Sequence, residues 1–283
     1  MALPHPAPDR AALVTGASSG IGREIARELA RRGHRLILVA RRAEALEELA
    51  AELRTARAST GAPAGVPAGG IRVDVLPTDL SSPIERAALS DRIAALEVTV
   101  DILVNAAGMS TIGPIAGADP DAERHMIELD VLAVVELCNR LIPPMLEGGS
   151  GAVLNVASTG AFQPVPGQAG YGASKAFVLS FTSALAGELN GSGVTATTLC
   201  PGPVDTGFGA TAGFSKADAD AALPRMMWRS AEIVARAAVD GLAAGRLVVI
   251  PGVPNRVGAA FARLVPTGPL VRQLAKRHPG LRP

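Results

Sequence analysis

Short apolar runs alternate along the chain with longer amphipathic stretches, which is the pattern of repeated strand–helix units. Strands joined by crossover helices pair in parallel, and right-handed crossovers place helices on both faces of the sheet. The pattern therefore predicts an α/β fold with a doubly wound, seven-stranded parallel sheet in a single domain spanning residues 1–283. The predicted strands are residues 12–16, 35–40, 71–76, 101–105, 152–158, 194–200 and 246–251.

Several helix starts can be located from capping residues. Ser82 is followed by proline and then, three residues after the cap, by Glu85, which together form a capping box with proline in the first turn. Asp119-Pro120 predicts another helix start of the same kind, and Ser230 predicts a third.

Two segments depart from the strand–helix alternation. Residues 59–70 are rich in Gly, Pro and Ala and predict a flexible surface insertion. In the tail, residues 256–283, arginine and lysine are interleaved with apolar residues, and no acidic residue follows Asp240. Such a tail could lie on an anionic membrane surface, or it could pack over the domain or a partner subunit with its charges in solvent.

Composition narrows the class of protein. The 283 residues are 48% hydrophobic but only 3% aromatic, so the core must consist of Ala, Val, Leu and Ile, which suits buried parallel strands. A net charge of +1 gives no reason to expect a nucleic-acid partner. Cys138 and Cys200 form no CxxC pair, so neither a disulfide framework nor a cysteine-rich metal site is expected.

No targeting or membrane-spanning segment is recognisable in the sequence. The N-terminus lacks a positive region followed by an apolar one, so we expect no signal peptide. The longest uncharged run, residues 148–174, is broken by glycines and prolines and could not cross a bilayer as a helix. The predicted location is the cytoplasm.

A glycine-rich turn follows the first predicted strand, in the sequence TGASSGIG at residues 15–22. A turn without Cβ atoms lets a pyrophosphate approach the backbone, and the helix that begins near Gly20 offers free N–H groups and a partial positive charge. The G-x3-G-x-G spacing differs from the commoner dinucleotide fingerprint, and a plain strand–helix turn is the alternative. The residues predicted to contact the cofactor here are Gly16, Ser18, Ser19, Gly20, Ile21 and Gly22.

The end of the second predicted strand indicates which dinucleotide is preferred. An acidic residue there would accept a hydrogen bond from the 2′-hydroxyl of NAD. Here the strand ends in Arg41 and Arg42, whose guanidinium groups suit a 2′-phosphate, with Ser18 as a helper. The sequence therefore favours NADP(H) over NAD(H), although two arginines at the start of a surface helix are the alternative.

The chain's only tyrosine, Tyr171, lies four residues before Lys175, so the two side chains share one helix face. A free tyrosine has a pKa near ~10, too high for ready proton exchange at neutral pH. A nearby ammonium favours the phenolate, and we therefore expect it to lower the pKa of Tyr171 and make it a general acid/base. The pair follows a predicted strand that ends in Ser158.

Together these residues resemble the short-chain dehydrogenase/reductase family of single-domain, Rossmann-like enzymes. The matching motifs are TGASSGIG (15–22), Asp79-Leu80, NAAG (105–108), Ser158, YGASK (171–175) and Pro201-Gly202 with Thr206, in the family's order and spacing.

The resemblance implies roles for the matched positions. Asp79 would contact the adenine, its neighbour Leu80 would also contact the cofactor, and Asn105 would steady the central sheet beside the cofactor. Lys175 would bind the nicotinamide ribose, and the segment 201–206 would contact the nicotinamide end. The further cofactor contacts implied in these motifs are Ala106, Gly108, Tyr171, Pro201, Gly202, Val204 and Thr206.

The resemblance also implies a mechanism. Hydride passes between the nicotinamide and a carbonyl or carbinol carbon, while Ser158 hydrogen-bonds the substrate oxygen. Tyr171 gives or takes the proton, and Lys175 tunes it. The family usually has an Asn in the helix after NAAG, where it holds a water in a proton relay, and the matching position here is Asp130. This departure predicts a modified relay, reduced turnover or a shifted pH optimum.

The expected substrate walls are residues 109–112, 161–168 and 205–228. The third carries two phenylalanines, two methionines and the only tryptophan, and it predicts an apolar lid, or else a loop packed on its own domain or a neighbouring subunit. We expect a carbonyl reductase or alcohol dehydrogenase for a small apolar substrate, assembled as a homodimer or homotetramer as the resemblance implies. The alternatives are a catalytically weak NADP(H)-binding sensor and a membrane-surface or scaffold protein.

Overall fold

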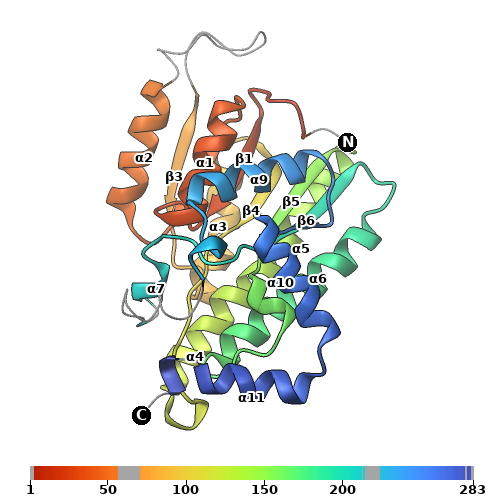
Figure 1. Cartoon of the computed structure of the whole chain (residues 1–283). Helices are drawn as coiled ribbons and strands as arrows, with labels where there is room; N and C mark the ends of the chain where they lie inside the picture. The colour runs from red at the N-terminus through yellow and green to blue at the C-terminus, as the bar shows by residue number, and fades with distance from the viewer. Residues whose placement is uncertain (1–2, 57–70, 212, 214–223, 278, 282–283) are drawn as a thin grey trace.

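The computed structural model describes residues 3–56, 71–211, 213, 224–277 and 279–281. These residues form an α/β domain around a seven-stranded, all-parallel sheet with the strand order β3-β2-β1-β4-β5-β6-β7 (Figure 1). The strands are β1 (Arg10–Thr15), β2 (Leu36–Ala40), β3 (Val73–Pro77), β4 (Thr99–Asn105), β5 (Gly151–Val156), β6 (Val194–Leu199) and β7 (Val248–Val249).

All seven predicted strands are present, with shifted ends. The last, β7, is much shorter than the predicted residues 246–251. Only two of its residues, Val248 and Val249, pair with β6. On the other side of the sheet centre, β1 begins two residues earlier than predicted, at Arg10. The sequence pattern locates the strands but not the extent of their pairing.

Alternate residues along the strands pack into two separate apolar cores, one on each face of the sheet. Ala12 and Val14 of β1 join the core under α1 (Gly20–Arg31), α2 (Ala43–Ala56) and α9 (Ala231–Ala243). Ala11 and Leu13 face the opposite core, under α3 (Pro83–Ala94), α5 (Ala133–Glu147) and α6 (Ala169–Glu188). The sheet is therefore covered on both faces, as a doubly wound fold requires.

The remaining elements gather around one end of the sheet (Figure 1). Helix α4 (Pro120–Ile127) runs through a wider, π-helical turn (Glu128–Leu132) into α5. The other short helices are α7 (Phe208–Thr211), α10 (Val253–Leu264) and α11 (Thr267–Arg277), with 3₁₀ turns at Ile115–Gly117, Thr159–Phe162, Arg225–Met227 and Pro279–Leu281.

The three predicted helix caps are confirmed. The Ser82 hydroxyl accepts the N–H of Glu85 at 3.3 Å, and Asp119 and Ser230 likewise accept N–H groups at the starts of α4 and α9. The carboxylate of Glu85 reaches past the cap and accepts the N–H of Asp79 at 2.7 Å. The reciprocal bond of the predicted capping box is therefore not made: the Ser82 N–H donates to the carbonyl of Asp79 at 3.1 Å, and Glu85 instead holds the loop that carries a predicted cofactor contact.

The predicted insertion at residues 59–70 lies outside the described residues. The basic tail forms α10 and α11. Within the described part of the chain, no helix combines the length and apolar character needed to cross a bilayer. The same residues contain no cluster of three or more His, Cys, Asp or Glu side chains able to hold a metal ion.

Candidate active site

The glycine turn after β1 has the shape of a phosphate cradle. Gly16 and Gly20 have φ angles of +67° and +56°, in the left-handed region that favours glycine. A Cβ on Gly22 would lie 2.5 Å from the carbonyl oxygen of Gly16, so the turn closes only without one. The N-cap of α1, Ser19, makes no side-chain capping bond, which leaves the first-turn N–H groups to an anion.

A buried threonine joins this turn to the loop after β4. The Thr15 hydroxyl accepts the N–H groups of Ala106 and Ala107, both at 3.0 Å, and donates to the carbonyl of Val104 at 3.3 Å. Sequence reasoning missed Thr15 as a site residue. The available signal was a polar residue at the end of an otherwise apolar strand.

Cationic groups gather at the end of β2, where an adenosine 2′-substituent is expected. Arg42 Nη2 donates to the hydroxyl and the carbonyl of Ser18 at 3.1 and 3.2 Å. Partial burial raises the pKa of Asp79, but hydrogen bonds from Ser81 and the charge of Arg41 bring it below its ordinary value. The predicted residues Ser18, Arg41, Arg42 and Asp79 are therefore brought to one region, and its charge suits a phosphate.

Three predicted catalytic side chains meet between β5 and α6. Ser158 lies just beyond β5, where its hydroxyl accepts the N–H of Gly160 at 3.0 Å. Tyr171 and Lys175 lie on the first turns of α6, and the lysine Nζ is 5.6 Å from the centre of the tyrosine ring. Hydrogen bonding also links Ser158 with Tyr171. A hydroxyl, a phenol and an ammonium thus converge at the carboxyl end of the sheet.

The expected lowering of the Tyr171 pKa by Lys175 is present, but it does not set the net direction. Burial raises the pKa of Tyr171 above its ordinary value. The charge of Lys175 and the hydrogen bond with Ser158 act in the opposite direction, while Asp130 and Cys200 raise the pKa further. The sequence indicated the ammonium and the carboxylate of Asp130, but not how strongly burial of the phenol raises its pKa.

Asp130 forms a buried ion pair with Lys175. Its side chain, 0% exposed in the π-helical turn, places Oδ2 2.9 Å from Lys175 Nζ, and its Oδ1 accepts the N–H of Met109 at 2.9 Å. Burial lowers the pKa of Lys175, but Asp130 and Tyr171 more than offset this, so the pKa lies above its ordinary value. The predicted proximity of the Asp130 carboxylate to Lys175 is confirmed.

Asn105 is fixed by a chain of buried amides. Its Nδ2 donates to Asn155 Oδ1 at 2.8 Å, and Asn155 Nδ2 donates to the Thr182 hydroxyl at 2.9 Å. These bonds join β4, β5 and α6 at the level of the site. Asn155 and Thr182 were not singled out from sequence, because a polar residue in an apolar strand does not reveal its partner.

The segment 201–206 crosses the glycine turn. A Cβ on Gly20 would lie 3.2 Å from Thr206 Cγ2, so these two residues are in close contact. Gly202 packs against Asn255 of α10 with no room for a Cβ between them. Asn255 is 1% exposed and donates to the carbonyls of residues 227 and 251 at 3.0 and 2.9 Å. Asn255 therefore anchors α10 to this segment, which sequence reasoning missed.

Two of the three predicted substrate walls are joined to one another. Gln168 Nε2 donates to the Ser110 hydroxyl at 2.7 Å, which links residues 161–168 with residues 109–112. Of the third wall, residues 205–228, positions 212 and 214–223 lie outside the described residues. Its Phe208 ring lies 5.9 Å from the Tyr171 ring, centre to centre.

The C-terminal segment adds to these walls, which the sequence did not predict. The guanidinium of Arg263 lies 4.5 Å from the centre of the Phe162 ring. A Cβ on Gly280 would lie 2.6 Å from Ile112 Cγ1, so the end of the chain touches the first wall. Helix α10 and the 3₁₀ turn Pro279–Leu281 therefore border the predicted substrate side of the site.

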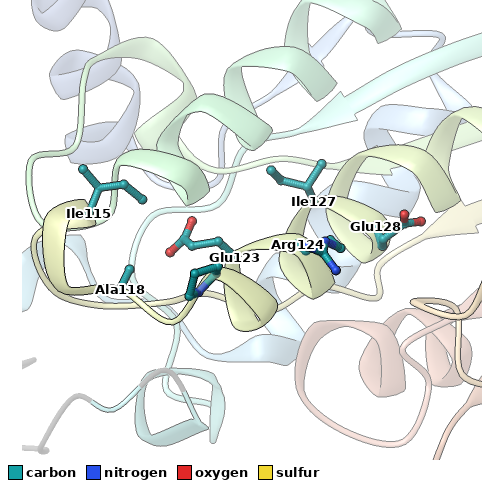
Figure 2. A pocket seen from close by; sticks show the side chains of 7 residues that line it. Ile115, Ala118, Glu123, Arg124, Ile127 and Glu128 are labelled. Carbon is teal, nitrogen blue, oxygen red and sulfur yellow. The ribbon is translucent and has the colours of Figure 1, made fainter.

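A separate hollow of about 510 Å³ lies along α4. Figure 2 shows the labelled lining residues Ile115, Ala118, Glu123, Arg124, Ile127 and Glu128 around it. None of the predicted catalytic or cofactor residues lines it, and its polar groups do not include the phenol, the hydroxyl or the ammonium described above. The candidate active site is therefore the convergence at Tyr171 and not this hollow.

Comparison with known proteins identifies the family. The family model described as short chain dehydrogenase matches residues 10–213 of this chain. The chain is 37% identical over 202 residues to a putative ketoacyl reductase of Streptomyces coelicolor, which covers 71% of this chain and 72% of that protein.

Two solved structures resemble nearly the whole chain. A short-chain dehydrogenase from Sphingobium yanoikuyae, in complex with NADPH, shares 32% identity with a TM-score of 0.76 and covers 93% of this chain and 94% of its own. L-Sorbose reductase from Gluconobacter frateurii, complexed with NADPH and L-sorbose, shares 27% identity with a TM-score of 0.72 over 88% of this chain and 97% of its own. The chain belongs to the short-chain dehydrogenase/reductase family, whose members are NAD(P)-dependent oxidoreductases.

Proposed function

We propose that this protein is an NADP(H)-dependent carbonyl reductase or alcohol dehydrogenase that acts on a small apolar ketone or secondary alcohol. The convergence of Ser158, Tyr171 and Lys175 beside a glycine turn shaped for a pyrophosphate carries the proposal. A hydroxyl, a phenol and an ammonium in this arrangement suit the polarisation and protonation of a carbonyl oxygen.

The glycine turn and the first N–H groups of α1 would hold the pyrophosphate, with Thr206 close to Gly20 on the opposite side. Arg41 and Arg42 would hold the 2′-phosphate, and Asp79 would contact the adenine. The bound cofactor supplies or accepts the hydride. The preference for NADP(H) rests on these two guanidinium groups, which suit a 2′-phosphate.

In the reductive direction, Ser158 donates a hydrogen bond to the substrate oxygen and Tyr171 donates its proton to that oxygen. The raised pKa of Tyr171 keeps the phenol protonated at neutral pH, which suits a proton donor. The Lys175 ammonium stabilises the phenolate that remains and would also hold the nicotinamide ribose. In the oxidative direction the same phenolate accepts the proton, so oxidation should require a higher pH.

The apolar substrate is proposed from the side chains around Tyr171. Phe208 stacks obliquely beside the tyrosine, and Phe162 and Ile112 line the neighbouring walls. The experiment is a turnover screen with NADPH and with NADH, using aryl and long-chain ketones against polar ketoses such as L-sorbose. We expect turnover of the apolar ketones with NADPH. If only the ketoses react, the proposal of an apolar substrate is wrong.

One observation favours a second candidate, an NADP(H)-binding sensor with weak catalysis. Asp130 forms an ion pair with the Lys175 ammonium. The same ammonium is needed to stabilise the phenolate during proton transfer. A wild-type protein that binds NADPH but turns over nothing in the same screen would favour the sensor.

We also propose a homodimer or homotetramer in the cytoplasm. Free, buried thiols at Cys138 and Cys200 suit a reducing compartment. Light scattering on the purified protein measures the assembly, and a monomer at micromolar concentration would contradict it.

A further inference from the structure

The ion pair between Asp130 and Lys175 leaves no free charge beside the phenol. Asp130 is 0% exposed and Lys175 is 5% exposed, and their charged atoms are 2.9 Å apart. A Cβ on Gly108 would lie 3.2 Å from both Asp130 Oδ1 and Lys175 Nζ, so the loop after β4 closes over the pair. The N–H of Met109 supplies a second donor to the carboxylate, as an ionised carboxylate requires.

The groups around the pair come from several elements. The Lys175 ammonium also donates to the carbonyl of residue 156 at 3.4 Å, at the end of β5. Cys200, beyond β6, is the other titratable group that acts on both Tyr171 and Lys175. Burial raises the pKa of the Cys200 thiol to about 12, so it stays neutral at physiological pH. The field at Tyr171 is therefore set by one cation and one anion, and the carboxylate opposes part of the effect of the ammonium.

We propose that Asp130 is a positioning residue, which holds the Lys175 ammonium in place and cancels much of its field, so that Tyr171 remains a proton donor into the alkaline range. The role of Tyr171 as a proton donor rests on the proposed function. The physical content of the inference is independent of turnover, because it concerns the pH at which one phenol ionises.

Tyr171 is the chain's only tyrosine, which gives a direct readout. Tyrosinate absorbs near 295 nm, so an ultraviolet pH titration of the folded protein reports the ionisation of Tyr171 alone. We expect the wild-type midpoint above ~10, the value of a free tyrosine. Asp130→Asn removes one negative charge at nearly constant shape, and we expect a midpoint lower by about one pH unit or more.

Asp101→Asn is the matched control, since Asp101 is also buried, at 1% exposed, but belongs to the middle of β4 and contacts none of these groups. Its tyrosinate midpoint should equal that of the wild type. In enzyme assays, the pH at which oxidation reaches half its maximum should fall in Asp130→Asn by the same amount as the optical midpoint.

The proposal is overturned if Asp130→Asn and the wild type titrate at the same pH, or if the wild type ionises at or below pH ~9. The second criterion needs no variant, so it decides the matter even if Asp130→Asn does not fold. A shifted titration in a protein without turnover would contradict the proposed function while leaving the role of Asp130 intact.

A different observation concerns the outward face of α10. Val253, Val257, Phe261 and Leu264 recur every three or four residues and share one helix face, and they are 60%, 63%, 63% and 83% exposed. Asn255 on the opposite face is buried through two hydrogen bonds, so the apolar stripe cannot turn inward without breaking them.

The two helices of the basic tail also carry exposed cations. Arg256 is exposed on α10, and Arg272 and Lys276 are exposed on α11. No acidic residue follows Asp240 in the sequence to neutralise them. A second copy of the chain docked with the same face would set cation against cation, which is unfavourable. An anionic lipid surface would accept both the apolar side chains and the charges.

We infer that the α10 face, with its flanking cations, docks on an anionic membrane surface. The test is co-sedimentation of the full chain with vesicles of phosphatidylcholine alone and of phosphatidylcholine with phosphatidylserine. We expect binding to the anionic vesicles only, weakening as salt rises. Phe261→Asp should weaken it at least about tenfold, whereas Ile84→Asp, at an 81% exposed site on α3, should leave it unchanged.

Equal binding to both kinds of vesicle, or unchanged binding of Phe261→Asp, would overturn this inference. Loss of oligomers in Phe261→Asp, measured by light scattering without vesicles and accompanied by no vesicle binding of the wild type, would also overturn it. That result would assign the face to contact between copies of the chain.

Discussion

Asp101 in the central strand β4 is a buried carboxylate whose charge has few stabilising partners. It is 1% exposed, neither of its oxygens has a hydrogen-bond partner among the described residues, and Arg10 Nη1 is 3.8 Å away. Burial raises the pKa of Asp101 from 3.8 to about 7. Between these values the folded protein holds a proton that the unfolded chain has released.

The folded state therefore gains stability from Asp101 at low pH and loses it as pH rises from about 4 to about 7. A shift of about three units corresponds to about 4 kcal/mol of unfolding free energy. Once Asp101 is ionised, near neutral pH, its buried charge without adequate partners lowers the free energy of unfolding.

His34 acts over nearly the same pH range with the opposite sign. It is 4% exposed, and burial lowers its pKa from 6.5 to about 4, with Arg32 acting in the same direction. The unfolded chain binds this proton first, so the stability that His34 contributes is lost as pH falls from 6.5 to 4. Its size is about 3 kcal/mol, which nearly offsets the contribution of Asp101.

Asp101→Asn removes one side of this balance. We expect the variant to be more stable than the wild type at pH 8, by up to about 4 kcal/mol, and to show no such gain at pH 4. Urea denaturation followed by the fluorescence of the single tryptophan, at pH 4 to 8, measures the difference. Asp91→Asn, at an exposed site on α3, is the control and should follow the wild type. A constant difference between Asp101→Asn and the wild type across this range would refute the reasoning.

Two further changes test the cofactor site. Arg41→Asp places an anion where we expect the 2′-phosphate, so the KM for NADPH should rise at least about thirtyfold while the KM for NADH changes little; equal use of both cofactors by the wild type would undo the assignment. Gly22→Ala forces a Cβ to within 2.5 Å of the Gly16 carbonyl, and NADPH binding measured by fluorescence should weaken at least about tenfold. Unchanged binding would show that the turn does not hold the cofactor.

Much of the fold follows from the sequence because its signals are local. Strand periodicity and caps such as Ser82 depend on residues within a few positions of one another, and both were predicted. The parallel pairing and the helices on both faces also follow, since strands joined by crossover helices allow few arrangements, but the strand order was not predicted. The length of β7 did not follow, because pairing at a sheet edge depends on a neighbouring strand.

The candidate site was predicted in part for the same reason. Tyr171 and Lys175 are one helical turn apart, so sequence spacing reveals their proximity. Thr15 and Asn255 act through contacts with residues far along the chain, which spacing does not show. The lowering effect of Lys175 on the pKa of Tyr171 was predicted, but the net rise was not, because burial is a property of the assembled fold.

Replacement of Tyr171 by phenylalanine tests the central claim most directly, because it removes one hydroxyl and keeps the ring. NADPH affinity, measured by titration calorimetry, should stay within about threefold of the wild type, while kcat for reduction of an accepted ketone should fall by about 10² to 10⁴. Retention of wild-type turnover by Tyr171→Phe would contradict the assignment of the proton transfer to this phenol.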